Sequence, residues 1–344
     1  MEVDLTKYNT AARICGDVYN MLKTSILQND IVDIKTLYNM GMDEITKRCD
    51  NIFKSIDRKG VAFPISINLN NCIDNFTYSD LDSTNVSDLV STNVSIIQLN
   101  DIVKIKLGVD IDGCIAMYCD TFIYNKENEC NTTIDFLHNM KKEIIKQVFP
   151  GNTNDELKIF IESKCTDNDC FPLINCKSFE HLDNQIYNTN GKYVILNYKK
   201  LYDKNDYLIH ENTCFEFLEN EVYTINLAVV PDDGSDNCIS ENDNGVRVDL
   251  DNTRLHRFND YFYSFKLNAS KQLYSKVFSD HCNNVFDISK YTSDKKLKMG
   301  VNECKKMNIL ETLPVTYTKN KLPVYSCAFT LVVKKDKSLM LKYN

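Results

Sequence analysis

The side chains that could do chemistry are five histidines and fourteen cysteines, and their spacing matches no catalytic motif. No HxxxH or HExxH pair occurs, and no GxxxxGK[ST], GxGxxG or GxSxG motif is present. Each histidine is therefore interpreted as a core or surface residue and not as a metal ligand. The five histidines are His138, His181, His210, His256 and His281.

The cysteines do not form a zinc-binding pattern. Cys114 and Cys119, like Cys165 and Cys170, are separated as CxxxxC, and no second pair or histidine stands at zinc-finger spacing. Residues 1–20 lack the basic-then-apolar order of a secretory signal, and no apolar run reaches 18 residues. We therefore expect reduced thiols, no membrane span, and a cytoplasmic protein that also enters the nucleus or nucleolus.

Charge is distributed unevenly along the chain, although its sum is only −8. Residues 1–246 contain 22 Lys and Arg against 39 Asp and Glu, whereas residues 247–344 contain 18 against 9. Two interpretations are equally open at this point. The last third either presents a face to an anionic partner or carries basic residues that simply solvate its helices.

The apolar pattern predicts helices and strands of an α+β protein with a mostly antiparallel sheet. Thr153 and Glu156 form a capping box, and Asp112-Gly113 marks a hairpin turn. Helices are expected at 4–27, 34–53 with an end marked by 57–60, 132–148, 153–165, 261–265, 270–282 and 298–310. Strands are expected at 61–70, 72–76, 102–109, 114–124, 193–197, 214–217, 222–230, 315–318, 324–333 and 339–343.

Four segments resemble one family in the order in which they occur. Lys59–Cys72 reads KGVAFPISINLNNC, Ile102–Ala116 reads IVKIKLGVDIDGCIA, Lys298–Pro314 reads KMGVNECKKMNILETLP, and Phe329–Val333 reads FTLVV. They are similar to type 2 methionine aminopeptidases, and most of all to the proliferation-associated, ErbB-receptor-binding branch. The resemblance implies a single pita-bread domain over 1–344, with a curved antiparallel sheet covered by helices. It also implies a helical insertion subdomain at 250–313.

The resemblance further implies that this chain has lost the family's metal site. An aminopeptidase of this family holds two metal ions with two Asp, one His and two Glu. The Asp positions fall on Lys106 and Met117, and the Glu positions on Asn226 and Ala328. A His that contacts substrate falls on Asn75. We therefore expect no cofactor, no bound metal and no catalysis.

Two details of this comparison are kept open. The family's ligand His has its nearest match at either Glu180 or His181. Strand alternation places Lys106 on the face opposite to its neighbours Ile105 and Leu107, so it is expected to pair with a local acid such as Asp112 or to reach solvent.

Non-catalytic members of this family, as the resemblance implies, bind the large ribosomal subunit near the peptide exit tunnel. We therefore expect rRNA and exit-tunnel proteins as partners, and no DNA. The alternatives are a module that binds peptide N-termini without cleaving them and, less favoured, an active aminopeptidase. The expected contacts, here called the basic set, are Arg247, Arg254, Arg257, Lys266, Lys271, Lys276, Lys295, Lys296, Lys298, Lys305 and Lys306.

Overall fold

The structure is a computed structural model, and it describes most of the chain. The described residues are 3–29, 32–78, 96–125, 131–173, 176–187, 192–196, 214–232, 246–259 and 263–343. Within these ranges, no helix combines the length and the apolar character that crossing a bilayer requires.

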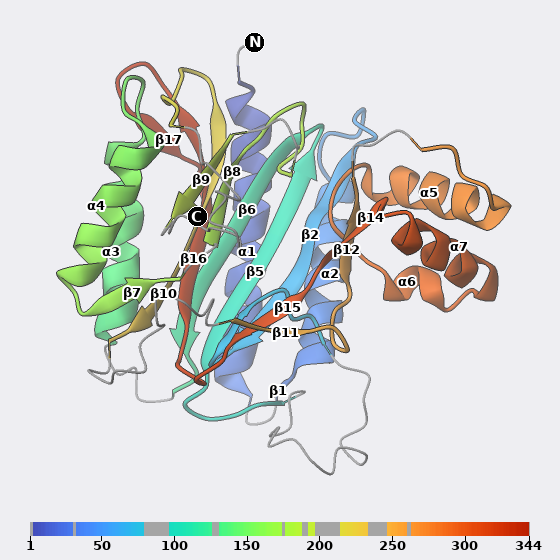
Figure 1. The fold of residues 1–344 in the computed structure, drawn as a ribbon, viewed down its shortest axis with the longest axis horizontal. Helices are drawn as coiled ribbons and strands as arrows, with labels where there is room; N and C mark the ends of the chain where they lie inside the picture. The colour runs from blue at the N-terminus through green and yellow to red at the C-terminus, as the bar shows by residue number, and fades with distance from the viewer. Residues whose placement is uncertain are drawn as a thin grey trace, which may run out of the picture.

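One nine-stranded sheet forms the centre of the molecule (Figure 1). Its strands follow the order β2-β5-β6-β16-β10-β8-β9, while β17 pairs with β16 and β7 pairs with β10. All of these pairings are antiparallel, as the sequence predicted. The bounds are β2 Lys59–Leu69, β5 Ile102–Ile111, β6 Cys114–Ile123, β7 Cys170–Pro172, β8 Cys176–Glu180, β9 Tyr193–Leu196, β10 Val222–Pro231, β16 Tyr325–Val333 and β17 Ser338–Met340.

The β5–β6 hairpin confirms the predicted turn. Ile111 pairs with Cys114, which leaves Asp112 and Gly113 as the two loop residues. Both have positive φ, at 55° and 82°, as a two-residue hairpin turn of right-handed strands requires. Asp-Gly is a favoured sequence there because glycine carries no Cβ to clash and aspartate tolerates the left-handed region.

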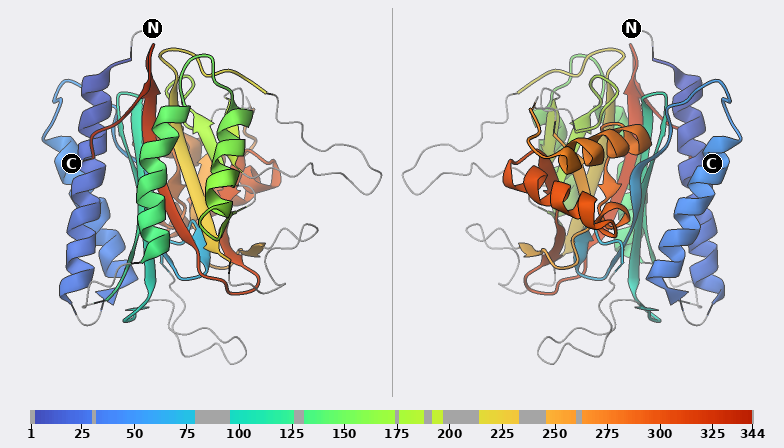
Figure 2. Two further views of the ribbon diagram at one scale, coloured as in Figure 1. Left: turned by 90° about the vertical axis from the view of Figure 1, so that its left-hand side faces the viewer. Right: turned by 90° about the vertical axis from the view of Figure 1, so that its right-hand side faces the viewer.

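Four helices pack on the sheet, and α1 and α2 lie together on one face of it (Figure 2). They contact β2, β5 and β6, whereas α3 contacts β16. Buried side chains recur along α1 at helical spacing, so one stripe of the helix meets the core. The predicted capping box of Thr153 and Glu156 is present at the start of α4. The bounds are α1 Leu5–Gln28, α2 Ile34–Asp50, α3 Thr132–Gln147 and α4 Asn154–Thr166.

Helix α2 ends earlier than the sequence predicted. It stops at Asp50, and Lys59 already belongs to β2. The Lys59 ammonium donates to the carbonyl oxygens of Ile52 at 2.7 Å and Phe53 at 3.2 Å. Lys59 therefore binds carbonyl groups that follow the end of α2, but it does so from β2. Because the prediction placed Lys59 next to the helix end, the predicted end is too late.

Short segments outside the main sheet add two three-stranded sheets and two strands paired on their own. β11 Val246–Asp249, β15 Val315–Thr318 and β3 Cys72–Asp74 form one sheet, and β1 Val32–Asp33 pairs with β4 Ile96–Ile97. The strand expected at 214–217 is wrong, because Glu216 makes only a single bridge with Thr153.

The segment 250–313, which we call the insertion, is a small layer beside β2 (Figure 1). It contains more strand than expected, because β13, β12 and β14 form a three-stranded sheet in addition to its helices. Two helix predictions are corrected: 263–265 is irregular, and the last helix spans 295–306 before a strand begins at Leu310. The bounds are β12 Leu255–Phe258, α5 Asn268–His281, β13 Phe286–Asp287, α6 Ser289–Thr292, α7 Lys295–Lys306 and β14 Leu310–Leu313.

The contact between α5 and α7 uses residues of the MGVNEC motif. A Cβ at Gly300 would lie 2.7 Å from the carbonyl oxygen of Ala269, so only glycine allows this approach. Glu303 accepts hydrogen bonds from the backbone N–H groups of Lys266 and Leu267 at 3.2 and 3.1 Å, and from the hydroxyl of Ser270. α5 has no cap from its own N-cap side chain, so Glu303 of α7 supplies that function.

The insertion is anchored to the main sheet through Asp110, which is 2 % exposed. Its carboxylate accepts from Asn284 of the insertion at 2.8 Å and from Arg58 at 2.8 Å. In addition, the N–H of Val285 donates to the carbonyl of Ala62 in β2 at 3.2 Å. The two parts therefore share a buried polar contact and a backbone hydrogen bond.

The α5–α7 contact predicts that Gly300→Ala destabilises the protein, although the same change usually stabilises a helix. In an exposed helix this change stabilises by about 0.5–1 kcal/mol. Here the new methyl group meets backbone, so we expect a loss of about 1–3 kcal/mol from forced separation of the helices. Urea unfolding measures the change, and Asn302→Ala, on the exposed side of α7, is the control. A stabilised Gly300→Ala variant would contradict the described packing.

Candidate functional site

Three of the five predicted positions lie in one row across the main sheet. Lys106 of β5 pairs with Cys119 of β6, Cys119 with Ala328 of β16, and Ala328 with Asn226 of β10. We call these four residues the central row. Because side chains alternate along a strand, Met117 shares the face of Cys119, two residues away. Four predicted positions therefore meet on one face of four adjacent strands.

Asn75 does not belong to this row. It follows β3 with a positive φ of 71°, and its side-chain amide donates to the carbonyl of Pro314 at 3.0 Å. The residue before it, Asp74, is the one that reaches the central row. Sequence reasoning missed Asp74, because nothing local places the end of β3 opposite β5.

Lys106 forms an ion pair inside the protein. Its ammonium lies 2.5 Å from Asp74 Oδ2 and 4.9 Å from the centre of the Phe63 ring. Lys106 does pair with an acid, but with Asp74, 32 positions away, and not with a local one, because Asp112 pairs with Lys7 at 2.6 Å. The other alternative, that Lys106 reaches solvent, is wrong, because the residue is only 7 % exposed.

The environment of Lys106 keeps it charged. Burial by itself disfavours the ammonium, but the attraction and hydrogen bond of Asp74 outweigh that effect and raise the pKa of Lys106. A permanent positive charge therefore stands in the central row. It repels any divalent cation brought to the same place.

Apolar side chains of this chain pack beside the row, around Met117 and Phe63. One buried cluster joins Phe63 of β2, Met117 of β6, Ile186, and Leu255 and Val285 of the insertion. The Tyr187 and Phe179 rings pack at the edge of this cluster with their centres 4.8 Å apart. Two surface cavities, of about 320 and 220 Å³, lie elsewhere and contain none of the five predicted positions.

Glu180 and His181, the two nearest matches to the family's histidine ligand, both hydrogen-bond within the protein. His181 Nε2 lies 2.8 Å from the hydroxyl of Thr224, which in turn lies 3.1 Å from the hydroxyl of Thr330. Burial lowers the pKa of His181 to about 3, so its ring is neutral. Glu180 instead accepts from the backbone N–H of Lys192 at 2.8 Å.

These residues do not fit a pair of divalent cations. A dinuclear site needs several carboxylates, and the face around the central row presents an ammonium, a thiol, a thioether, a methyl group and an amide. The one carboxylate that reaches it, that of Asp74, is already paired with Lys106. Among the described residues, no group of three or more His, Cys, Asp or Glu side chains is placed to hold a metal ion. The correspondence of each position with a family ligand stays a prediction.

The other histidines follow the interpretation given from the sequence. Burial lowers the pKa of His256 and of His281 to about 4, so both are neutral; His256 is a core residue and His281 is half-buried. His138 is a surface residue with 47 % of its side chain exposed. His210 lies outside the described residues.

Two members of the basic set have structural roles. Arg257 is 8 % exposed, pairs with Glu311 at 2.5 Å and donates to the carbonyl of Tyr187 at 2.8 Å. Arg254 stacks over the Tyr78 ring at 4.0 Å and donates to the Tyr78 carbonyl at 3.0 Å. Both are therefore poor candidates for an external contact.

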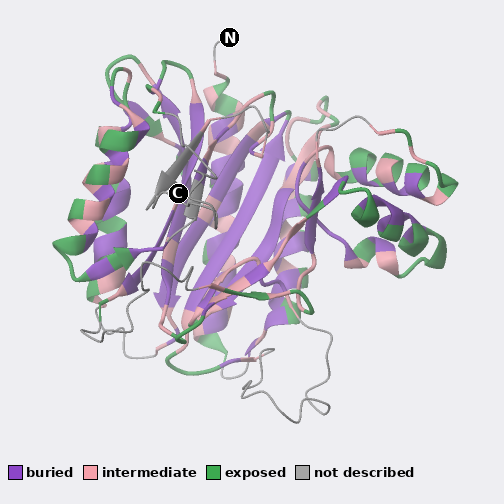
Figure 3. Cartoon of the chain, viewed as in Figure 1, coloured by how far each residue is buried: buried purple, intermediate pink, exposed green. Residues whose placement is uncertain are grey.

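The remaining nine members of the basic set are exposed, and seven of them lie on two helices. Lys271 and Lys276 are on α5, and five lysines are on α7. Figure 3 shows much of the surface of these helices as exposed. The sequence argument missed Lys290, an exposed lysine of α6 beside them. The five on α7 are Lys295, Lys296, Lys298, Lys305 and Lys306.

A model of metallopeptidase family M24 matches residues 6–248. The chain belongs to metallopeptidase family M24. ErbB-3 binding protein 1 of Solanum tuberosum is 25 % identical over 345 residues, which cover 97 % of this chain and 80 % of that protein. The predicted resemblance to the ErbB-receptor-binding branch is confirmed.

Solved structures confirm the predicted pita-bread fold. A thermophilic Arx1 superposes with a TM-score of 0.77 at 19 % identity, covering 99 % of this chain and 91 % of that one. Methionine aminopeptidase of Thermotoga maritima superposes with a TM-score of 0.59 at 10 % identity, covering 99 % and 97 %. The M24 chain described here therefore keeps the architecture of an aminopeptidase around a row of residues unsuited to metal.

Because Lys106 and Asp74 are paired, we expect that the effects of mutating them on the free energy of unfolding are not additive. Lys106→Met removes the buried ammonium and leaves Asp74, whose side chain is 30 % exposed, without its partner, so we expect a loss of about 1–3 kcal/mol in the free energy of unfolding. Adding Asp74→Asn should recover part of that loss.

Urea unfolding of the two single variants and the double variant measures this coupling. Lys47→Met is the control, because 72 % of that side chain is exposed. Strictly additive losses would show that the pair is not coupled in solution.

Proposed function

We propose that this chain is a non-catalytic member of the M24 family that associates with the large ribosomal subunit near the peptide exit tunnel. It would act there in ribosome biogenesis or translation control, through the insertion and the basic C-terminal third. Its partners would be rRNA and exit-tunnel proteins, and its location the cytoplasm and the nucleus or nucleolus. No metal or other cofactor takes part in this proposal.

The observation that carries the non-catalytic part is the ion pair of Lys106 with Asp74. A metallopeptidase needs a cluster of negative charge to hold its ions, and here a buried ammonium already neutralises the nearest carboxylate. The filled space around Phe63 and Met117 supports the same conclusion, because a substrate N-terminus would have to displace core side chains.

The ribosome part is supported by the exposed lysines of α5, α6 and α7. Many ammonium groups on one small layer favour a polyanion, because each contact with a phosphate releases a counter-ion. The resemblance to the ErbB-receptor-binding branch supplies the identity of that polyanion. The net negative charge of the remainder of the chain would keep the other faces away from RNA.

Two alternatives remain testable. A module that binds peptide N-termini would need an open pocket at the central row, and the cluster around Met117 and Leu255 disfavours it. An active aminopeptidase would need metal there, and the charge of Lys106 disfavours that.

Co-sedimentation with purified large subunits tests the ribosome association. We expect pelleting that weakens steeply as salt rises from 50 to 200 mM, on the order of the slopes seen for several phosphate contacts. Charge reversal of Lys295, Lys296 and Lys298 should weaken binding at least about tenfold and flatten the salt dependence.

The matched control reverses Lys47, Lys54 and Lys142, three exposed lysines outside the insertion. Duplex DNA as competitor should displace the protein less well than rRNA. Absence of salt-sensitive pelleting, or equal losses in both triple variants, would contradict the proposed surface.

Elemental analysis and a peptidase assay test the non-catalytic part. The purified protein should contain no stoichiometric Co, Mn, Zn or Fe, and Met-peptides should stay intact with any of these ions added. The reason is that Lys106 repels cations from the central row. Two metal ions per chain, or turnover above a metal-only blank, would refute this part of the proposal.

A further inference from the structure

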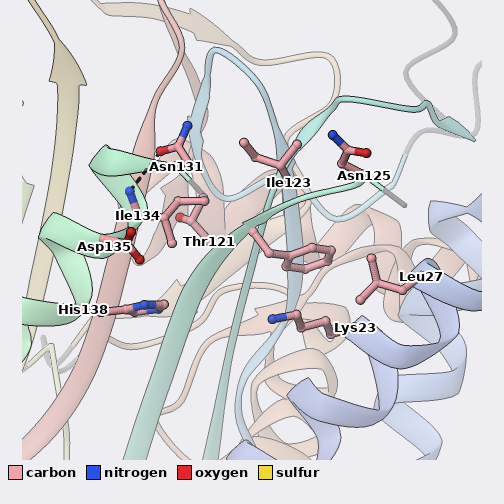
Figure 4. Close-up of a pocket in the computed structure, with 10 residues that line it drawn as sticks. Lys23, Leu27, Thr121, Ile123, Asn125, Asn131, Ile134, Asp135 and His138 are labelled. Carbon is pink, nitrogen blue, oxygen red and sulfur yellow. Dashed lines mark hydrogen bonds between the residues drawn. The ribbon is translucent and has the colours of Figure 1, made fainter. Parts of the chain in front are cut away.

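A cavity of about 320 Å³ lies between α1 and α3, over the end of β6 (Figure 4). This volume is within the range of small-molecule sites, about 300–1,000 Å³. The cavity is separate from the central row and from the insertion. Its walls contain the side chains of Leu27, Ile123 and Ile134 and the amides of Asn125 and Asn131.

Two basic side chains face one another across this cavity. Figure 4 shows Lys23 of α1 and His138 of α3 on opposite sides of it. The Lys23 ammonium lies over the Phe122 ring, 5.2 Å from its centre. Within the described part of the chain, Lys23 has no acidic partner and no hydrogen-bond acceptor. Lys23 is a half-buried residue, and an ammonium without a counter-ion favours an anion beside it.

The opposite wall is held in place by a buried carboxylate. Asp120 accepts from Lys141 at 2.9 Å and from the Tyr118 hydroxyl at 3.2 Å, and it lies 3.3 Å from His138 Nε2. Burial alone would raise the pKa of Asp120, but its bonds to His138 and Lys141 outweigh this and lower it. Asp120 therefore has a cationic partner of its own in Lys141, and its contact with Nε2 orients the His138 imidazole at the cavity wall.

One carboxylate, that of Asp135, also lines the cavity. Asp135 is exposed and forms no ion pair with Lys23, so water screens it. It stands in the first turn of α3, where a carboxylate complements the helix dipole. Asp135 therefore lowers the positive charge of the lining without pairing directly with Lys23.

We propose that this cavity binds a small anion, a phosphate or carboxylate group carried on an apolar body. The anion pairs with Lys23 and His138, and the apolar body packs on Leu27, Ile123 and Ile134. This site is independent of the ribosome surface, because none of its residues lies in the insertion.

Isothermal titration of the full chain with phenyl phosphate tests the proposal. We expect saturable binding of one molecule per chain, weakened at least fivefold by Lys23→Gln and by His138→Gln. Lys164→Gln is the matched control, because Lys164 also lies over an aromatic ring, that of Phe160 at 5.9 Å, but on α4 outside the cavity. Inorganic phosphate should bind more weakly than phenyl phosphate, because it lacks the apolar body.

Further ligands distinguish the sources of the anion and the sign of the charge. Benzoate binding as tightly as phenyl phosphate would assign a carboxylate ligand, and weaker benzoate binding would assign a phosphate ester; either outcome supports an anion site. Phenyltrimethylammonium binding as tightly as phenyl phosphate would overturn it. So would absent saturation, or a loss in Lys164→Gln equal to that in Lys23→Gln. His138 imidazole resonances that do not shift on titration, in a folded wild-type chain, would also overturn it.

Discussion

An ion pair between a lysine of the main sheet and an aspartate beside it sets the charge of the central row in this M24 chain. Lys106 and Asp74 meet at 2.5 Å, with the ammonium almost fully buried. A buried charge is stable only when it is paired, so the ammonium of Lys106 requires the half-buried carboxylate of Asp74. Their contact joins β5 to the end of β3 and places a positive charge in the central row. That charge opposes divalent cations there, while the strands around it keep the M24 fold.

The insertion depends on a second set of constraints, all of them polar or steric. Gly300 allows α5 and α7 to approach, and Glu303 caps α5 from the neighbouring helix. Asp110 then connects Asn284 of the insertion to Arg58 beside β2. These contacts are made mostly by buried groups, whereas the lysines of α5 and α7 stay at the surface. Rigidity and a basic surface are thus supplied by different residues of the same helices.

The sequence predicted much of the fold because the relevant signals are local. Helical spacing, the Thr153–Glu156 capping box and the Asp112-Gly113 turn act within a few residues. It also predicted positions that meet in the central row, because the resemblance carried their spacing. The prediction from the sequence failed at two places where contacts between distant parts of the chain override the local pattern. Lys59 marked a helix end that lies nine residues earlier, and the apolar run after α7 became strand β14 by pairing with β12.

The sequence alone determined which side chains are present. Positions 106, 117, 226 and 328 carry Lys, Met, Asn and Ala and no carboxylate, and the last third of the chain has an excess of basic residues. Only the tertiary structure decided what those side chains do. It paired Lys106 with Asp74 and not with Asp112, it buried Arg257, and it placed Arg254 on the Tyr78 ring. The physical reason is that a charge pairs with the opposite charge nearest in space, and the positions of β3, β5 and β12 in their three sheets fix those distances.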